Sequence, residues 1–245
     1  MTEPNFIVRG HPSYVWRRGQ ERRLDLLRRS VHLENRWILD VGCGVGTWMR
    51  AFGRFSSHVF GVDVEAPRVA EARQDQPGAL VAVSEYLPFP DAAFDVVFLH
   101  EVIEHVADDR ETVREAFRCT RPGGSIVIFA PNRLYPFETH GFYWGDRFIF
   151  RLLPLINYTP DFIRDRFCHH VRIYTQRRIL RLFDGLDVEF MVRSHIYPGF
   201  DNVAQRMPRL GHFIQQATDI AERTPLRSFG ISHFIVAQKR AADSL

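Results

Sequence analysis

The sequence predicts an α/β protein built on a doubly wound, mainly parallel sheet. Short, nearly continuous apolar segments alternate with segments of helical periodicity, which is typical of strands that are buried on both faces and joined by crossover helices. A cluster of glycines directly follows the first apolar segment, where such sheets bind their ligands. The length of 245 residues and the hydrophobic fraction of 45% suit one globular unit.

Composition narrows the class of protein. The formal net charge is only +3, with 32 basic and 29 acidic residues, so we expect no nucleic acid partner. No apolar stretch approaches the roughly 18 residues that cross a bilayer, and residues 1–30 carry seven arginines without the apolar core of a secretory signal. Cys43, Cys119 and Cys168 form no CxxC pair. These features predict a cytoplasmic protein in a reducing compartment.

The elements are expected in the following order. Residues 14–30 place Leu24 and Leu27 on one stripe among arginines, which predicts an amphipathic helix. Five strands are expected next, and two more come late in the chain. Their predicted ranges are 37–41, 58–62, 79–83, 96–99, 125–130, 187–193 and 231–237.

A long insertion, which we expect to be helical and rich in aromatic residues, separates the fifth and sixth strands. Residues 141–168 contain eight aromatic side chains, a density well above the 13% of the whole chain. Insertions of this length are often functional, and pockets favour aromatic linings. We therefore expect a lid or acceptor pocket over 136–168, with arginines that could engage an anionic group (Arg147, Arg151, Arg164 and Arg166). The alternative is an auxiliary helical pair that packs on the edge of the sheet.

The most informative segment runs from Trp37 to Thr47, where an apolar strand meets Gly42, Gly44 and Gly46. Glycines there allow a sharp turn and a close approach of a ligand to the backbone. The spacing is GxGxG and not the GxGxxG of dinucleotide-binding proteins. Asp63 ends the second predicted strand, where a carboxylate can accept both hydrogen bonds of a ribose diol.

These segments resemble the class I S-adenosylmethionine-dependent methyltransferases, in particular the methyltransferase type 11 branch that includes enzymes of ubiquinone and menaquinone biosynthesis. The glycine segment resembles their motif I. The stretch from Ser84 to Val97 resembles the signature around strand four, and Arg121–Gly124 resembles the turn before strand five. The resemblance implies a Rossmann-like sheet of seven strands with the last strand antiparallel, and S-adenosylmethionine over the carboxyl ends of the strands.

The resemblance also implies a set of cofactor-binding residues. In many relatives an acid contacts the adenine amine where this chain has Val83. Adenine would then depend on backbone groups near Ser84 and Glu85 and on packing by Val64. Asp40 could instead be purely structural. The full expected set is Asp40, Gly42, Gly44, Gly46, Asp63, Val64, Ser84, Glu85 and His100.

Candidate catalytic residues follow the fourth and fifth strands. An acceptor that arrives protonated, such as an alcohol or phenol, needs a general base. His100, Glu138 and His140 are the candidates because the carboxyl ends of neighbouring strands meet at one edge of the sheet. A purely structural His140 is the alternative.

A second group, Glu101, Glu104 and His105, has the i, i+3, i+4 spacing of one helix face. It resembles the metal-binding motif of the ubiquinone-pathway O-methyltransferases. The same pattern also occurs in metal-free relatives, where the residues serve as hydrogen-bonding groups at the start of a helix. We expect no metal.

The sequence thus predicts a methyltransferase that acts on a small or lipid-like acceptor at oxygen, with at most transient membrane contact. The alternatives are a nicotinamide-dependent oxidoreductase, which the glycine spacing and the single lysine, Lys239, disfavour, and a non-catalytic domain that keeps the cofactor cleft. One domain is expected over 1–245: an N-terminal helical segment (1–34), a cofactor-binding half (35–131), the insertion (132–175) and the C-terminal half of the sheet (176–245).

Overall fold

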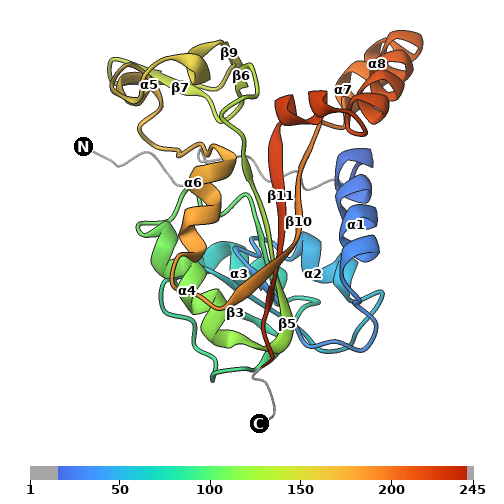
Figure 1. Cartoon of the computed structure of the whole chain (residues 1–245), viewed down its shortest axis with the longest axis vertical. Coiled ribbons are helices and arrows are strands. Elements are labelled where there is room, and N and C mark those ends of the chain that lie inside the picture. Colours follow the sequence, from blue (N-terminus) through green and yellow to red (C-terminus); the bar gives the residue numbers. More distant parts are fainter. Residues whose placement is uncertain (1–15, 242–245) are drawn as a thin grey trace.

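The computed structural model describes residues 16–241 and is organised around one mixed sheet of seven strands (Figure 1). The strand order is β10-β11-β5-β4-β1-β2-β3. The strands are β1 (Ile38–Val41), β2 (Val59–Asp63), β3 (Ala79–Val81), β4 (Phe94–His100), β5 (Thr120–Pro131), β10 (Val188–Ile196) and β11 (Ser232–Lys239). All seven predicted strands are present.

The direction of the strands also agrees with the prediction. β1 pairs in parallel with β2 and β4, and β5 continues the parallel set beside β4. β11 is antiparallel to both β5 and β10. The last strand is therefore the antiparallel one, and it is inserted between two strands that run the other way.

Helices cover both faces of the sheet. They are α1 (Arg18–Ser30), α2 (Thr47–Phe52), α3 (Ala66–Ala72), α4 (Asp109–Cys119), α6 (Gln176–Leu180) and the 3₁₀ turn η3 (Arg181–Phe183). α1 ends at the predicted residue, whereas residues 14 and 15 of the expected helix lie outside the described part of the chain. Within residues 16–241, no helix combines the length and apolar character needed to cross a membrane.

Two apolar cores lie on opposite faces of the sheet because successive strand residues point to opposite sides. Leu39 and Val97 belong to the core beneath α4 and α6. Their neighbours Ile38 and Val96 belong to the core beneath α1 and α2. Burial on both faces explains why the parallel strands have continuous apolar sequences in place of an alternating pattern.

Two additional segments lie at the carboxyl end of the sheet (Figure 1). The first is the insertion after β5. It contains α5 (Asp161–Cys168), the turn η2 (Ile156–Tyr158) and two small paired sheets, β6 (Phe137–Glu138) with β9 (Leu153–Pro154) and β7 (Phe142–Trp144) with β8 (Arg147–Ile149). The sequence predicted its helical part but not these short strands. The second segment joins β10 to β11 and contains α7 (Asp201–Arg206), α8 (Pro208–Ala221) and η4 (Pro225–Phe229).

Candidate active site

A cleft of about 1130 Å³ opens at the carboxyl ends of the strands, which is where doubly wound sheets bind ligands. Loops that follow β1 to β5, the start of α1 and the segment after β10 form its walls. Eight of the predicted site residues line it: Gly42, Gly44, Asp63, Val64, Ser84, Glu85, His100 and His140. Asp40, Gly46 and Glu138 are not part of its lining.

The glycine loop forms a cradle that is open toward the cleft. Gly42, Gly44 and Gly46 all have positive φ, at +75°, +53° and +83°. A Cβ on Gly42 would lie 2.4 Å from Val102 Cγ2, so only glycine fits there. A Cβ on Gly44 would meet no described atom within 4 Å. Because Gly44 lines the cleft, a side chain there would occupy space that a ligand could use.

Asp63 joins the glycine loop to the next loop. Its Oδ2 accepts the Gly44 N–H and its Oδ1 accepts the Glu65 N–H, both at 2.9 Å. Each carboxylate oxygen can accept more than one hydrogen bond, so both retain capacity for hydroxyl groups in the cleft. The carboxylate therefore has a fixed orientation at the lip of the cradle.

Asp40 lies beneath the loop and is 1% exposed. Burial and the nearby negative charge of Asp63 raise the pKa of Asp40 well above its ordinary value. Its Oδ2 has no hydrogen-bond partner among the described residues. Asp40 is thus a buried carboxyl group outside the lining of the cleft.

Ser84 and Glu85 follow β3 and connect it to the loop after β4. Glu85 accepts the backbone N–H groups of Ala107 and Asp108, at 2.9 and 3.2 Å. The Ser84 hydroxyl lies 3.1 Å from the Thr112 hydroxyl of α4. These contacts hold one wall of the cleft in a single arrangement.

His140 is oriented by a buried carboxylate. Glu138 Oε1 accepts a hydrogen bond from His140 Nδ1 at 2.8 Å, and Oε2 accepts one from Arg164 at 2.6 Å. Burial alone would raise the pKa of Glu138, but the His140 hydrogen bond and the positive charges around it lower that pKa to about 2. An ionised carboxylate can only accept, so the ring nitrogen that faces Glu138, Nδ1, carries a proton. In the neutral form of the ring, Nε2 is then the nitrogen with the lone pair.

The structure gives His100 a different environment. It ends β4 and packs against Trp48 and Phe129, with ring centroids 5.0 and 5.5 Å away. Burial lowers the pKa of His100 to about 3, and its Nε2 has no hydrogen-bond partner in the described chain. A histidine with so low a pKa is a poor base at neutral pH.

The predicted helix face over Glu101, Glu104 and His105 is wrong. Glu101 has a φ of +55°, which interrupts helical geometry, and α4 begins only at Asp109. Asp108 caps that helix by accepting the N–H groups of its first turn. Residues 101–106 therefore form turns, and the Glu101 carboxylate accepts a hydrogen bond from Ser232 at 2.6 Å.

This turn brings Glu104 and His105 close to His140. One potential ligand atom from each of the three residues lies within 4.8 Å of the others. Burial and the charge of Glu101 raise the pKa of Glu104 well above its ordinary value, and neither of its carboxylate oxygens has a hydrogen-bond partner within residues 16–241. The cluster is thus compatible either with a protonated Glu104 or with a divalent cation.

Sequence reasoning missed Arg23, which reaches the cleft from α1. Its guanidinium lies 4.0 Å from Glu101 and 3.4 Å from the Ser232 hydroxyl, and its Nε has no hydrogen-bond partner in the described chain. Arg23 adjoins the buried stripe of α1, but nothing in the sequence distinguishes it from the other arginines of that helix.

Comparisons with known proteins identify the domain. Residues 39–128 match the family model described as a methyltransferase domain. A ubiquinone biosynthesis O-methyltransferase of Aromatoleum aromaticum is 30% identical over 197 residues, which are 70% of this chain and 82% of that protein. A probable S-adenosylmethionine-dependent methyltransferase of Mycolicibacterium smegmatis is 37% identical over 109 residues, or 44% of this chain. The match spans only 42% of the length of the Mycolicibacterium protein. It spans 60% of the length of a ubiquinone biosynthesis O-methyltransferase of Pseudomonas fluorescens.

Solved structures show the same fold. An S-adenosylmethionine-dependent methyltransferase from Mesorhizobium loti has a TM-score of 0.59 at 18% identity and covers 87% of this chain and 96% of its own. The [4+2]-cyclase SpnF has a TM-score of 0.58 at 18% identity, with 94% and 85% covered. At these identities the likeness concerns the fold alone, and fold does not by itself fix chemistry.

The fold and the cleft define a doubly wound α/β domain with a ligand-binding cleft at the carboxyl ends of its parallel strands. Its sequence relatives then place it more closely: the chain belongs to the class I S-adenosylmethionine-dependent methyltransferases. S-adenosylmethionine is the cofactor of this domain, and the cradle at Gly44, which is open to the cleft, fits a ligand of this kind.

Proposed function

We propose that this protein transfers a methyl group from S-adenosylmethionine to an oxygen atom of a small, largely apolar or lipid-like acceptor. The observation that carries the proposal is His140, a histidine on the cleft wall whose tautomer is fixed by the buried Glu138. Relatives named ubiquinone biosynthesis O-methyltransferases support oxygen as the target.

The donor side of the cleft is assigned to the loops after β1 and β2. Gly42 and Gly44 allow the cofactor to approach the backbone, and Asp63 offers its remaining acceptor capacity to the ribose hydroxyls. Val64, which is exposed to the cleft, and the loop at Ser84 and Glu85 would contact the adenine. Gly46 and Asp40 lie outside the lining of the cleft. His100 lines it and packs against Trp48 and Phe129, so it would contact the cofactor or the acceptor through its ring.

The acceptor side is assigned to His140. When bound, S-adenosylmethionine supplies a methyl group on a positively charged sulfur, which a nucleophile can displace in line. The protein must therefore align the acceptor and take its hydroxyl proton. His140 Nε2 would take that proton, while the Glu138 carboxylate would stabilise the imidazolium that results. Glu138 lies behind His140 and is 1% exposed, so it is a positioning residue and not a direct acceptor contact.

The insertion is proposed to cover the acceptor. Phe150 lines the cleft together with Thr139 and His140. One correction to the sequence prediction concerns Arg164, which is 2% exposed and bonded to Glu138. Arg164 is therefore not available to bind an anionic group, because its charge is used inside the protein.

The alternatives explain less. The matched family consists of methyltransferases, which gives no support to a nicotinamide-dependent reaction. A non-catalytic domain would have no need of a histidine that is held in one tautomer by a buried carboxylate and a buried arginine.

Two conservative variants test the proposed base. His140→Gln removes the proton acceptor and should lower kcat by about 10² or more, with unchanged affinity for S-adenosylhomocysteine. Glu138→Gln should lower kcat by a smaller factor because the base remains but loses its orientation. Turnover is measured with labelled S-adenosylmethionine and a lipid extract as the source of acceptor.

His169→Gln, on the same insertion but outside the cleft lining, is the control and should keep the turnover of the wild type. Normal turnover in His140→Gln would refute the role of the base.

A further inference from the structure

Helix α8 meets the rest of the protein through polar contacts. Gln215 is 3% exposed; it donates a hydrogen bond to the Gly199 carbonyl at 2.8 Å and accepts one from Arg18 of α1 at 2.7 Å. Asp219 forms ion pairs with Arg18 and Arg22, each at 3.0 Å. The side of α8 that faces the protein is thus its hydrophilic side.

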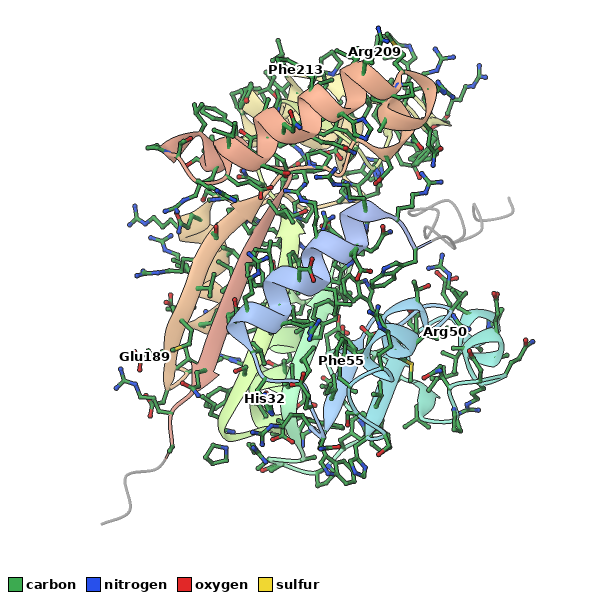
Figure 2. The ribbon with its side chains drawn as sticks, turned by 90° about the vertical axis from the view of Figure 1, so that its right-hand side faces the viewer. His32, Arg50, Phe55, Glu189, Arg209 and Phe213 are labelled. Carbon is green, nitrogen blue, oxygen red and sulfur yellow. The ribbon has the colours of Figure 1, made fainter. Side chains whose placement is uncertain are left out.

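The opposite side of α8 is apolar and exposed. Leu210, Phe213 and Ile220 have the spacing of one helix face and are 43%, 68% and 65% exposed. Figure 2 shows Phe213 on the side of the helix that is turned away from α1. Three further apolar residues of the same segment are exposed: Met207, which directly precedes α8, and Leu226 and Phe229 of η4. An amphipathic helix normally turns its apolar stripe toward the core, so the reversed orientation leaves this stripe for an external partner.

The charges of the segment are sorted in the same way. Its acidic residues face the protein: Asp219 as described above, Glu222 through an ion pair with Arg22 at 2.7 Å, and Asp201 through the Gly19 N–H at 3.3 Å. Its arginines are exposed, and none of them forms an ion pair with a described residue. They are Arg206, Arg209, Arg223 and Arg227. The exposed charged residues of the segment 206–229 are therefore all arginines.

We propose that α8 and its adjoining turns, residues 206–229, dock reversibly on an anionic membrane surface. Apolar side chains on one helix face can enter the boundary between headgroups and acyl chains, while arginines contact lipid phosphates. A second copy of this chain fits less well, because a two-fold contact centred on this face would set the same four arginines of each copy against one another.

The position of the segment links docking to the cleft. The connection between β10 and β11, which contains residues 206–229, also contributes Pro198, Gly199 and Ile231 to the lining of the cleft. Figure 1 places α7 and α8 at the same end of the molecule as the insertion. Docking would therefore hold the mouth of the cleft near the bilayer. That the bilayer supplies the acceptor rests on the proposed function. Binding of residues 206–229 to the membrane does not depend on it.

Vesicle flotation of the full chain tests the proposal without any acceptor. Vesicles of phosphatidylcholine alone are compared with vesicles that contain about 30% phosphatidylglycerol. The wild-type protein should bind the anionic vesicles about tenfold better, and the double variant Phe213→Asp/Ile220→Asp should lose about tenfold of that binding. Met191→Asp, a change at a 54% exposed residue of β10, is the matched control and should bind as the wild type does.

The outcomes are distinct. Absence of wild-type binding to anionic vesicles, or full binding by the double variant, would overturn the proposal. A wild-type dimer that the double variant converts to a monomer, without vesicle binding, would assign the face to a second copy. Calorimetric binding of S-adenosylhomocysteine is measured for every variant and should be unchanged, which shows that the domain is folded. Loss of that binding in the wild type would count against the proposed function and not against docking.

Discussion

Gly44 and Gly123 have similar backbones in different surroundings. Their φ values are +53° and +77°, and a Cβ on either would meet no described atom within 4 Å. Gly44 lines the cleft, whereas Gly123 lies within the first residues of β5, away from the cleft lining. The pair therefore separates the cost of backbone strain from the cost of filling the cleft.

Gly44→Val should lower the affinity for S-adenosylhomocysteine at least about tenfold, because the new side chain would occupy the cradle. Both variants place a side chain at a left-handed φ, so each should lower the free energy of unfolding by about 1–2 kcal/mol. Gly123→Val should, however, leave the affinity for S-adenosylhomocysteine unchanged. Calorimetry and thermal unfolding measure both properties. Equal affinities in the two variants would mean that the loop does not hold the cofactor.

Among single residues, the sequence predicted those at strand ends best. Gly44 and Asp63 line the cleft because the carboxyl ends of parallel strands meet at one end of the sheet, and His140 reaches the same cleft from the insertion that follows β5. It could not predict that Glu138 lies behind His140, since that depends on Arg164, which is 26 residues away and becomes buried only when the insertion folds.

At the scale of elements, the strands were predictable and the loops were not. A strand buried on both faces leaves a continuous apolar segment that is visible in the sequence. Residues 101–106 show the opposite case: their i, i+3, i+4 spacing suits a helix, yet the positive φ of Glu101 and the cap at Asp108 delay the helix to Asp109. Such a competition is decided by tertiary contacts, here the hydrogen bond from Ser232 to Glu101.

The turn over residues 101–106 supports a prediction about metal. If Glu104 is protonated in its buried site, turnover should survive exhaustive chelation. Labelled methyl transfer before and after dialysis against a chelator measures this. Activity that disappears with the chelator and returns with magnesium or zinc would instead place a cation among Glu104, His105 and His140. It would also favour an acceptor with two adjacent oxygen atoms.

The insertion supports a second prediction at this scale. Its own small core, formed by Ile156, Cys168 and Val171, is separate from the two cores of the sheet. Replacing residues 142–166 by a short Gly/Ser bridge should therefore leave the affinity for S-adenosylhomocysteine within a few-fold and abolish acceptor turnover.

Phe150→Ala is a useful companion to this deletion, because it changes only the one aromatic residue of the deleted segment 142–166 that lines the cleft, and it should raise the KM for the acceptor. A deletion variant that fails to fold would show that the aromatic residues support the core of the sheet and do not form a lid.

In the whole molecule, two segments lie beyond the carboxyl ends of the parallel strands (Figure 1), and both contribute residues to the lining of the cleft. The insertion after β5 brings His140 and Phe150 to the cleft, and the segment between β10 and β11 contributes Pro198 and Gly199. The aromatic density of the first segment made it visible in the sequence. The second was not singled out, because an amphipathic helix has the same periodicity whichever side faces the protein.

Methylation of an apolar acceptor at oxygen can be tested with S-adenosylmethionine that carries a ¹³C-labelled methyl group. The protein is incubated with this cofactor and a lipid extract, and the label is located by mass spectrometry and NMR. We expect a labelled methyl group on an oxygen of an apolar product that the wild type forms and that both Gly44→Val and His140→Gln form far more slowly. A label on nitrogen or carbon, or a product that both variants form at the rate of the wild type, would refute the proposed function.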